Sequence, residues 1–171
     1  IDLLVDIVSR NGNLLLNFPL PGSGALDEAE LKILSEITAW MQVNSEAIYA
    51  TRPWKIFGEG PGIRKTDPKA GFIGTPEHFN ERNRVDLTAA DIRYTTKGGT
   101  LFAFAMGWDP KEFVLPALAP SRRLYERKVA RVELLGSKAP LQWRLADDGL
   151  HIDAPPARPC HHTTAFRILP A

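Results

Sequence analysis

DIRYTTKGGTLFAFAMGWDP, residues 91–110, decides the architecture of most of this chain. Two runs rich in β-branched and aromatic residues flank Lys97-Gly98-Gly99, which predicts a β-hairpin with a tight glycine turn. Apolar residues alternate along the returning strand and therefore fall into two sets, one on each face. The first set is Phe102, Phe104, Met106 and Trp108, and the second, with mostly small side chains that allow close packing, is Leu101, Ala103, Ala105 and Gly107.

Further short strands are predicted on both sides of this hairpin. They are WKIF (54–57), RVELLGS (131–137) and TTAFRIL (163–169). Residues 141–155 indicate a second hairpin, with Asp147-Asp148-Gly149 as its turn. Residues 58–84 show no periodicity and are expected to form a polar loop. Short strands at regular spacing, separated by turn residues, predict an antiparallel β-sandwich over residues 52–171.

The first 51 residues have a different pattern. Leu3, Leu4, Ile7 and Val8 predict the last turns of a helix that ends at Gly12, a residue suited to a left-handed cap. NLLLN at 13–17 predicts a strand that is apolar on both faces, as in a covered parallel sheet. Asp27, with Glu30 three residues later, indicates a capped helix that ends near Asn44. Its apolar face is expected to be Leu31, Leu34, Ile37, Thr38 and Met41.

The order helix, buried strand, helix is typical of a repeating β/α architecture, in which each strand has parallel neighbours. We therefore expect residues 1–51 to be the last strand and helix of a (β/α)8-type barrel, followed by a sandwich domain at 52–171. The other barrel strands would precede Ile1, and the absence of an initiating Met suggests a processed chain or a piece of a longer one. Without a barrel to cover it, the apolar surface of residues 1–51 should make the chain associate, and a homo-oligomer is one such outcome.

Composition excludes several classes of function. The chain has 44% hydrophobic residues, which is enough for a core. Its 21 basic and 20 acidic side chains offer no broad field for nucleic acid or an anionic membrane, so neither is an expected partner. No apolar run approaches the roughly 20 residues of a membrane span. A single cysteine, Cys160, excludes an internal disulfide framework.

Candidate binding motifs are weak when each is compared with its ordinary structural explanation. The PGSG turn at 21–24 lacks the Lys-Ser/Thr pair of a phosphate loop and is followed by acidic residues. Cys160, His161 and His162, with His151 nearby in sequence, resemble metal ligands. Adjacent residues of an extended segment point to opposite sides, however, and zinc ligands are usually spaced further apart. We expect no metal site and no cofactor.

Aromatic and acidic residues raise two further alternatives, and packing and turn formation are the expected explanations. Tyr94, Phe102, Phe104, Trp108 and Trp143 could form a platform on which sugars stack, although a sandwich core requires the same alternation. Trp40 and Trp54 are expected to pack helices or domains together. Asp147 and Asp148 are neighbours on a turn, whereas a glycosidase pair must face each other across a bond. No Ser-His-Asp or Cys-His arrangement is evident.

Several long motifs resemble the α-L-fucosidases of glycoside hydrolase family 29. LVDIVSRNGNLLLN followed by a Gly/Pro loop, a helix and SEAIYATRPW is similar to the end of that family's catalytic barrel. DIRYTTKGGTLFAFAMGW and VELLGSKAPLQWRLADDGLHIDAP are similar to its later segments. The chain departs from the family pattern at Ser45, where Gly is common, and at Phe18-Pro19-Leu20 in the loop after the predicted strand.

The resemblance implies a retaining exo-glycosidase that removes α-L-fucose from glycoconjugates through a covalent intermediate. The family's Asp nucleophile, its acid/base carboxylate and the histidines that bind fucose lie before this segment, so none is assigned here and the chain is expected to be inactive by itself. Asn17, at the end of the predicted barrel strand, is the candidate residue near the substrate. Fucosylated glycans are the expected partners of the full-length enzyme, and many relatives are secreted, periplasmic or lysosomal.

Two alternatives to the fucosidase hypothesis remain open. The sandwich could be a carbohydrate-binding module that uses exposed aromatic residues such as Trp108 or Trp143. It could instead be a structural domain that supports a catalytic barrel, with Trp54 near the hinge. Exposed, coplanar rings would favour the first alternative, and rings packed into a core would favour the second.

Overall fold

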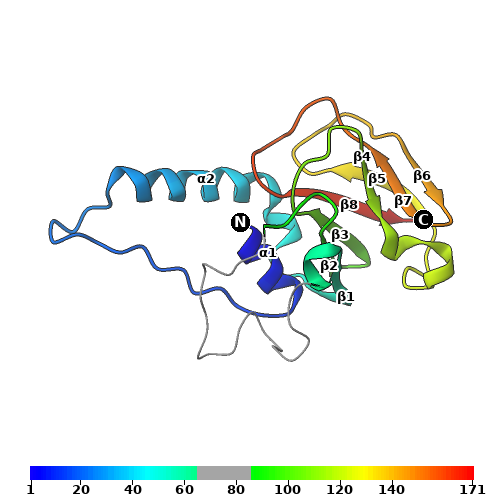
Figure 1. The fold of residues 1–171 in the computed structure, drawn as a ribbon, viewed down its shortest axis with the longest axis horizontal. Helices are drawn as coiled ribbons and strands as arrows, with labels where there is room; N and C mark the ends of the chain where they lie inside the picture. The colour runs from blue at the N-terminus through cyan, green and yellow to red at the C-terminus, as the bar shows by residue number, and fades with distance from the viewer. Residues whose placement is uncertain (65–85) are drawn as a thin grey trace.

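The computed structural model describes residues 1–64 and 86–171, so most of the predicted loop at 58–84 lies outside the described residues. The two longer helices come first, and the strands follow with shorter helical turns among them (Figure 1). The helices are α1 (Asp2–Ser9), α2 (Glu28–Asn44) and α3 (Pro61–Arg64), with short 3₁₀ turns η1 (Ser45–Ala47), η3 (Pro116–Leu118) and η4 (Pro120–Arg122). The strands are β1 (Arg52–Glu59), β2 (Ile92–Lys97), β3 (Thr100–Ala105), β4 (Glu112–Leu115), β5 (Val129–Leu134), β6 (Trp143–Ala146), β7 (Gly149–Asp153) and β8 (Thr164–Pro170).

In the described part of the chain, the strands form two antiparallel sheets. The larger sheet has the order β1-β2-β3-β8-β5, and the smaller sheet has the order β4-β7-β6. The predicted antiparallel sandwich is therefore confirmed. The sequence analysis missed β4, because this strand is short and followed at once by Pro116. Phe113 and Leu115 nevertheless alternate into the core and pair β4 with β7.

Both predicted hairpins are present. Lys97 pairs with Thr100 across a two-residue turn, in which Gly98 and Gly99 have φ angles of +59° and +88°. Positive φ at both positions is the conformation that matches the twist of the flanking strands, and glycine adopts it without strain. In the second hairpin Ala146 pairs with Gly149, and the residues between them form the turn.

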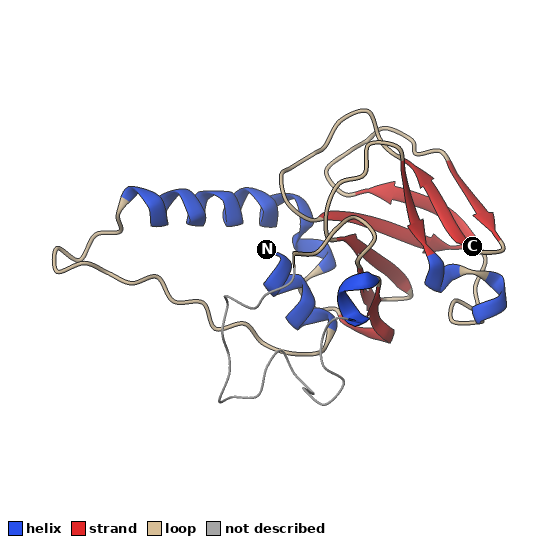
Figure 2. Cartoon of the chain, in the orientation of Figure 1, coloured by secondary structure: helices blue, strands red, loops and turns tan. Residues whose placement is uncertain are grey.

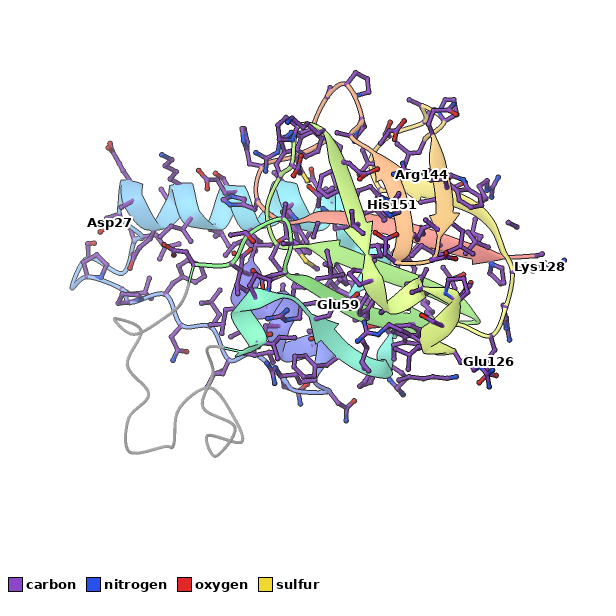
Figure 3. The ribbon with its side chains drawn as sticks, turned by 45° about the vertical axis from the view of Figure 1, so that its right-hand side comes forward. Asp27, Glu59, Glu126, Lys128, Arg144 and His151 are labelled. Carbon is purple, nitrogen blue, oxygen red and sulfur yellow. The ribbon has the colours of Figure 1, made fainter. Side chains whose placement is uncertain are left out.

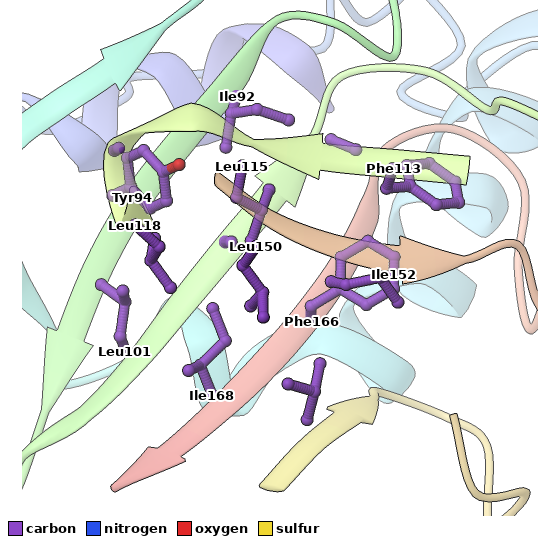
Figure 4. Close-up of a cluster of buried hydrophobic side chains, with 14 of the residues drawn as sticks. Ile92, Tyr94, Leu101, Phe113, Leu115, Leu118, Leu150, Ile152, Phe166 and Ile168 are labelled. Atoms are coloured by element: carbon purple, nitrogen blue, oxygen red, sulfur yellow. The ribbon is translucent and has the colours of Figure 1, made fainter. Parts of the chain in front are cut away.

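The main core lies between the two sheets (Figure 4). It collects the inward faces of β2, β3 and β8 from the larger sheet and of β4 and β7 from the smaller one. Its largest members include Tyr94, Leu101, Phe113, Leu115, Leu150, Ile152, Phe166 and Ile168. The small face of β3, with Ala103 and Ala105, belongs to this core and lets the sheets approach, as the sequence predicts.

A second core covers the other face of the larger sheet. Phe102, Phe104 and Met106 point away from the smaller sheet and pack against Val5 of α1 and Trp40 of α2. The sequence places these aromatic residues in a core but not against the helices. Trp108, expected on the same face, instead packs on the main core, where its ring meets Phe113 at 5.5 Å.

Both predicted helices form, and α1 ends at Ser9, three residues before the predicted Gly12 cap. α2 begins after Asp27, whose side chain accepts a hydrogen bond from the Glu30 amide at 2.9 Å, and it ends at Asn44. α1 is closed by a left-handed residue, but that residue is Asn11, with a φ of 66°, rather than Gly12. The Gly12 amide then bonds the Ile7 carbonyl, and the Asn11 amide bonds that of Val8, which is the Schellman arrangement.

The strand predicted at 13–17 is not formed. In the described structure these residues have no strand partner and lie in an extended connection between α1 and α2 (Figure 2). A strand exists through hydrogen bonds to a neighbour, and within the described ranges none lies beside this segment. The three consecutive leucines therefore identify an apolar segment, but they do not determine its backbone conformation in this structure.

Candidate functional site

The feature of the fold that most needs a functional explanation is an exposed apolar surface on the N-terminal part of the chain. The connection before α2, and the first half of α2, project away from the sandwich (Figure 1). The side chains that define this surface are Leu15, Leu16, Leu20, Leu31, Ile33 and Leu34, with exposed fractions from 38% for Leu34 to 84% for Leu15. Large exposed apolar residues gathered in one part of a structure mark an interaction surface.

Asn17 lies within this projecting segment. Its side chain is exposed, and it follows Leu15 and Leu16 in the connection. Nothing in the described residues tests its predicted place beside a substrate. Asn17 therefore stays a prediction.

The second half of α2 is firmly attached to the sandwich. Trp40 is 1% exposed, its ring packs on Phe104 at 6.4 Å, and its Nε1 donates to the Thr163 carbonyl at 2.8 Å. Asn44 is buried and donates from Nδ2 to the Trp40 carbonyl at 3.0 Å and to Cys160 Sγ at 3.4 Å. The expectation that Trp40 packs a helix is confirmed.

A buried ion pair attaches α1 to the larger sheet. Asp6 receives Arg93 Nε on Oδ1 at 2.5 Å and Arg10 Nε on Oδ2 at 2.9 Å, and the side chains of Asp6 and Arg93 are 8% and 3% exposed. Phe57 lies beneath the Arg10 guanidinium, 3.7 Å from its carbon to the ring centroid. The sequence analysis did not identify this pair, although an acidic residue inside the apolar run LLVDIV was the available signal.

A second carboxylate, which is partly buried, fixes the edge of the larger sheet. Glu59 accepts from the Tyr94 hydroxyl at 2.6 Å, from the Ala117 amide at 2.7 Å and from Arg122 at 2.6 Å. Burial, followed by the Glu59 charge, raises the pKa of Tyr94 well above its ordinary value. These contacts join β1 and β2 to the turn that follows β4, so Glu59 is a structural residue.

The suspected metal ligands are not brought together. Within residues 1–64 and 86–171 no group of three or more potential metal-binding side chains is assembled. His162 meets Glu36 of α2 at 3.1 Å, Cys160 contacts Asn44, and His151 lies on β7. The same described residues contain no helix that is both long enough and apolar enough to span a membrane.

The aromatic residues pack rather than form a platform. Tyr94, Phe102 and Phe104 are at most 1% exposed. Trp54 packs on Tyr94 at 4.9 Å, and Trp143 is partly buried against the main core. The expected explanation, core packing, is confirmed, and these rings do not support the carbohydrate-binding alternative.

Polar side chains gather on the outer face of the smaller sheet. His151 of β7 lies beside Arg144 of β6 (Figure 3). Its ring also contacts Glu112 of β4 and Asp148 of the β6–β7 turn. The hydrogen bond to Asp148, followed by that to Glu112, raises the pKa of His151 above its ordinary value of 6.5. Asp148 thus serves the turn and this cluster, and it does not form a glycosidase pair with Asp147.

Taken together, the geometry defines a β-sandwich with two attached helices and an apolar surface that extends beyond it. Two family models match this chain. The model "Alpha-L-fucosidase" matches residues 1–46. The model "Alpha-L-fucosidase C-terminal domain" matches residues 84–169, which by themselves are about half of the chain. The chain belongs to the α-L-fucosidase family, as its motifs indicate.

Curated relatives match most of this chain but in each case a smaller part of themselves. The alpha-L-fucosidase of Branchiostoma floridae is 25% identical over 98% of this chain and 31% of its own length. The human tissue alpha-L-fucosidase is 26% identical over 91% of this chain and 27% of its own length. The chain therefore spans about a third or less of these relatives.

Solved structures share the fold. The Thermotoga maritima alpha-fucosidase bound to a mechanism-based inhibitor superimposes with a TM-score of 0.67, at 21% identity, over 97% of this chain and 32% of that protein. Alpha-L-fucosidase isoenzyme 1 from Paenibacillus thiaminolyticus gives a TM-score of 0.64, at 24% identity, over 98% and 32%. Because these alignments include nearly the whole chain, they extend over α1 and α2 as well as the sandwich.

Proposed function

We propose that these 171 residues act as the carboxy-terminal part of an α-L-fucosidase, a retaining exo-glycosidase that hydrolyses α-L-fucosides from glycoconjugates. The observation that carries the proposal is the order of the two family matches, the enzyme model first and its C-terminal domain second. The catalytic nucleophile and the acid/base would come from residues outside this chain. Fucosylated glycans would be substrates of the whole enzyme.

Residues 1–51 would then be the last elements of a catalytic β/α barrel. The exposed apolar surface supports this assignment, because it projects from the sandwich and needs a partner. When barrel strands cover it, the extended segment at 13–17 would pair as a strand, which its three leucines favour. Asn17 would then lie at the strand end that faces the active site.

The sandwich would support the barrel rather than bind glycans. Two contacts favour this role: the Asp6–Arg93 ion pair joins α1 to β2 of the larger sheet, and the Trp40–Thr163 hydrogen bond joins α2 to the residue that precedes β8. Both contacts are buried, so the sandwich would hold α1 and α2 in fixed positions. The packed aromatic rings are consistent with the same conclusion.

Hydrolysis of 4-nitrophenyl α-L-fucoside tests the proposal. The product of the complete reading frame that encodes these residues should release nitrophenolate, and the 171-residue chain by itself should not exceed the buffer rate. The 4-nitrophenyl β-D-galactoside serves as the control substrate and should be cleaved far more slowly. Fucoside hydrolysis by the 171-residue chain would contradict its inactivity, and a complete product that prefers the galactoside would overturn the fucosidase assignment.

A further inference from the structure

The cluster around His151 is a second arrangement of titratable groups, separate from the apolar surface and from the fucosidase assignment. Leu150 and Ile152 of β7 point into the main core, and His151 therefore points to the outer face of the smaller sheet. A histidine on an outer face is ordinarily exposed, but His151 is only 7% exposed. The side chains from the neighbouring strands cover it.

Three elements supply those side chains. Arg144 lies directly opposite His151 in the β6–β7 pairing, and Glu112 lies diagonally across on β4, where Val114 is the residue opposite His151. Asp148 comes from the β6–β7 turn. Both ring nitrogens are contacted: Nε2 lies 2.8 Å from Asp148 Oδ1, and Nδ1 lies 3.0 Å from Glu112 Oε2.

Arg144 and Glu112 compete for Nδ1. The Arg144 Nη2 atom also lies 3.0 Å from Nδ1, while its Nη1 donates to Glu112 Oε1 at 2.7 Å. A neutral ring can accept from Arg144 at Nδ1 but then presents a lone pair to the Glu112 carboxylate. A protonated ring donates to both carboxylates, and the contact with Arg144 becomes unfavourable. The preferred neighbour of Nδ1 thus depends on one proton.

We propose that His151 forms a pH-dependent link within the smaller sheet. The imidazolium joins Glu112 on β4 to Asp148 on the β6–β7 turn, and loss of the proton weakens that connection. The charged groups that face the ring are Glu112, Arg144 and Asp148, and Asp153 lies further out, 4.0 Å from Arg144. Two carboxylates against one guanidinium at the ring favour the charged imidazole.

The expected pH window follows from the direction of each shift. Because the pKa of His151 is raised in the folded chain, the link stabilises the folded state fully below about pH 6.5. This contribution is lost as the pH rises through the pKa of His151 in the folded chain. The pKa values of Glu112 and Asp148 are lowered, in each case chiefly by the hydrogen bond from His151, so their contribution is lost as the pH falls below about 4. The sandwich should be most stable in mildly acidic solution.

The test is the thermal unfolding midpoint of the 171-residue chain, followed by tryptophan fluorescence from about pH 5 to pH 8. We expect the midpoint of the wild-type chain to fall by about 2–4 °C between about pH 6 and pH 8. Glu112→Gln should lower the unfolding midpoint at every pH, because it also removes the ion pair to Arg144. It should also make the decrease in the midpoint with rising pH smaller. Asp148→Asn keeps the turn chemistry and should flatten the fall as well.

Glu36→Gln is the matched control, because it removes the carboxylate that contacts the more exposed His162. It should leave the pH dependence unchanged. An NMR titration of the His151 ring in the wild-type chain provides a readout that a merely structural role would not change. A folded His151 that titrates below 6.5, or variants at both Glu112 and Asp148 that retain the full wild-type fall, would overturn the proposal.

Discussion

The two halves of α2 both contain apolar residues, but their environments differ. Trp40, in the second half, is 1% exposed and hydrogen-bonded to the sandwich, whereas Leu31 and Ile33, in the first half, are each about half exposed. Both halves contain apolar residues at helical spacing, so the pattern predicts a helix for both. Burial additionally requires a partner surface, and in the described structure the larger sheet reaches the second half of the helix.

Removal of a buried ring that packs on the attached half of α2 should have the largest effect on stability. Phe104→Ala should lower the free energy of unfolding by about 3–5 kcal/mol, because it leaves a cavity beneath Trp40. Urea unfolding of both chains measures the difference. Leu34→Ala, in the projecting half of α2, is the matched control and should change the free energy far less. Equal losses in the two variants would contradict the contrast between the halves.

Loss of the buried carboxylate of α1 should also lower stability, because this carboxylate attaches α1 to the larger sheet. Asp6→Asn leaves the buried Arg93 guanidinium without its counter-charge, and we expect about 3 kcal/mol of destabilisation in urea. Glu126→Gln, which removes an exposed partner of Lys55, is the control and should leave the urea midpoint unchanged. A variant at Asp6 as stable as the wild type would show that α1 does not depend on this pair.

The projecting half of α2 should depend on its cap instead. Asp27→Ala removes the acceptor for the Glu30 amide and should destabilise the first turns of the helix by about 1 kcal/mol. Hydrogen exchange of the amides in these turns should become faster, whereas exchange around Trp40 should not change. Asp27→Ser retains a capping oxygen, and its exchange pattern should resemble that of the wild type.

Substitution of the exposed leucines should have the smallest effect on stability and a large effect on association. Leu15→Gln together with Leu16→Gln should change the free energy of unfolding by less than about 0.5 kcal/mol, because neither side chain is buried. Sedimentation velocity should find less self-association in the double variant than in the wild-type chain. A wild-type chain that is monomeric at high micromolar concentration would contradict an adhesive role for this surface.

The sequence predicts elements well where local chemistry determines them. The Gly98-Gly99 turn, the Asp147-Asp148 turn and the Asp27 cap each follow from a few neighbouring residues, and all three are present. The segment at 13–17 is different, because a strand depends on hydrogen bonds to residues elsewhere in the protein.

Contacts between distant residues were the part that sequence reasoning missed. The Asp6–Arg93 pair and the cluster of Glu112, Arg144 and His151 each join different elements of the fold. Their members are ordinary charged residues in the sequence, and which of them meet is decided by the pairing register and by helix packing. The single local signal was an acidic residue within an apolar helix.

Hydrogen–deuterium exchange of residues 13–37 is the most direct test of whether a catalytic barrel covers the exposed apolar surface. The measurement compares the 171-residue chain with the product of the complete reading frame that encodes it. In the 171-residue chain we expect rapid exchange at residues 13–17 and in the first turns of α2. In the complete product we expect strong protection of the same amides. Equally rapid exchange in both proteins would show that this apolar surface is not covered, and it would contradict the assignment of residues 1–51 to a catalytic barrel.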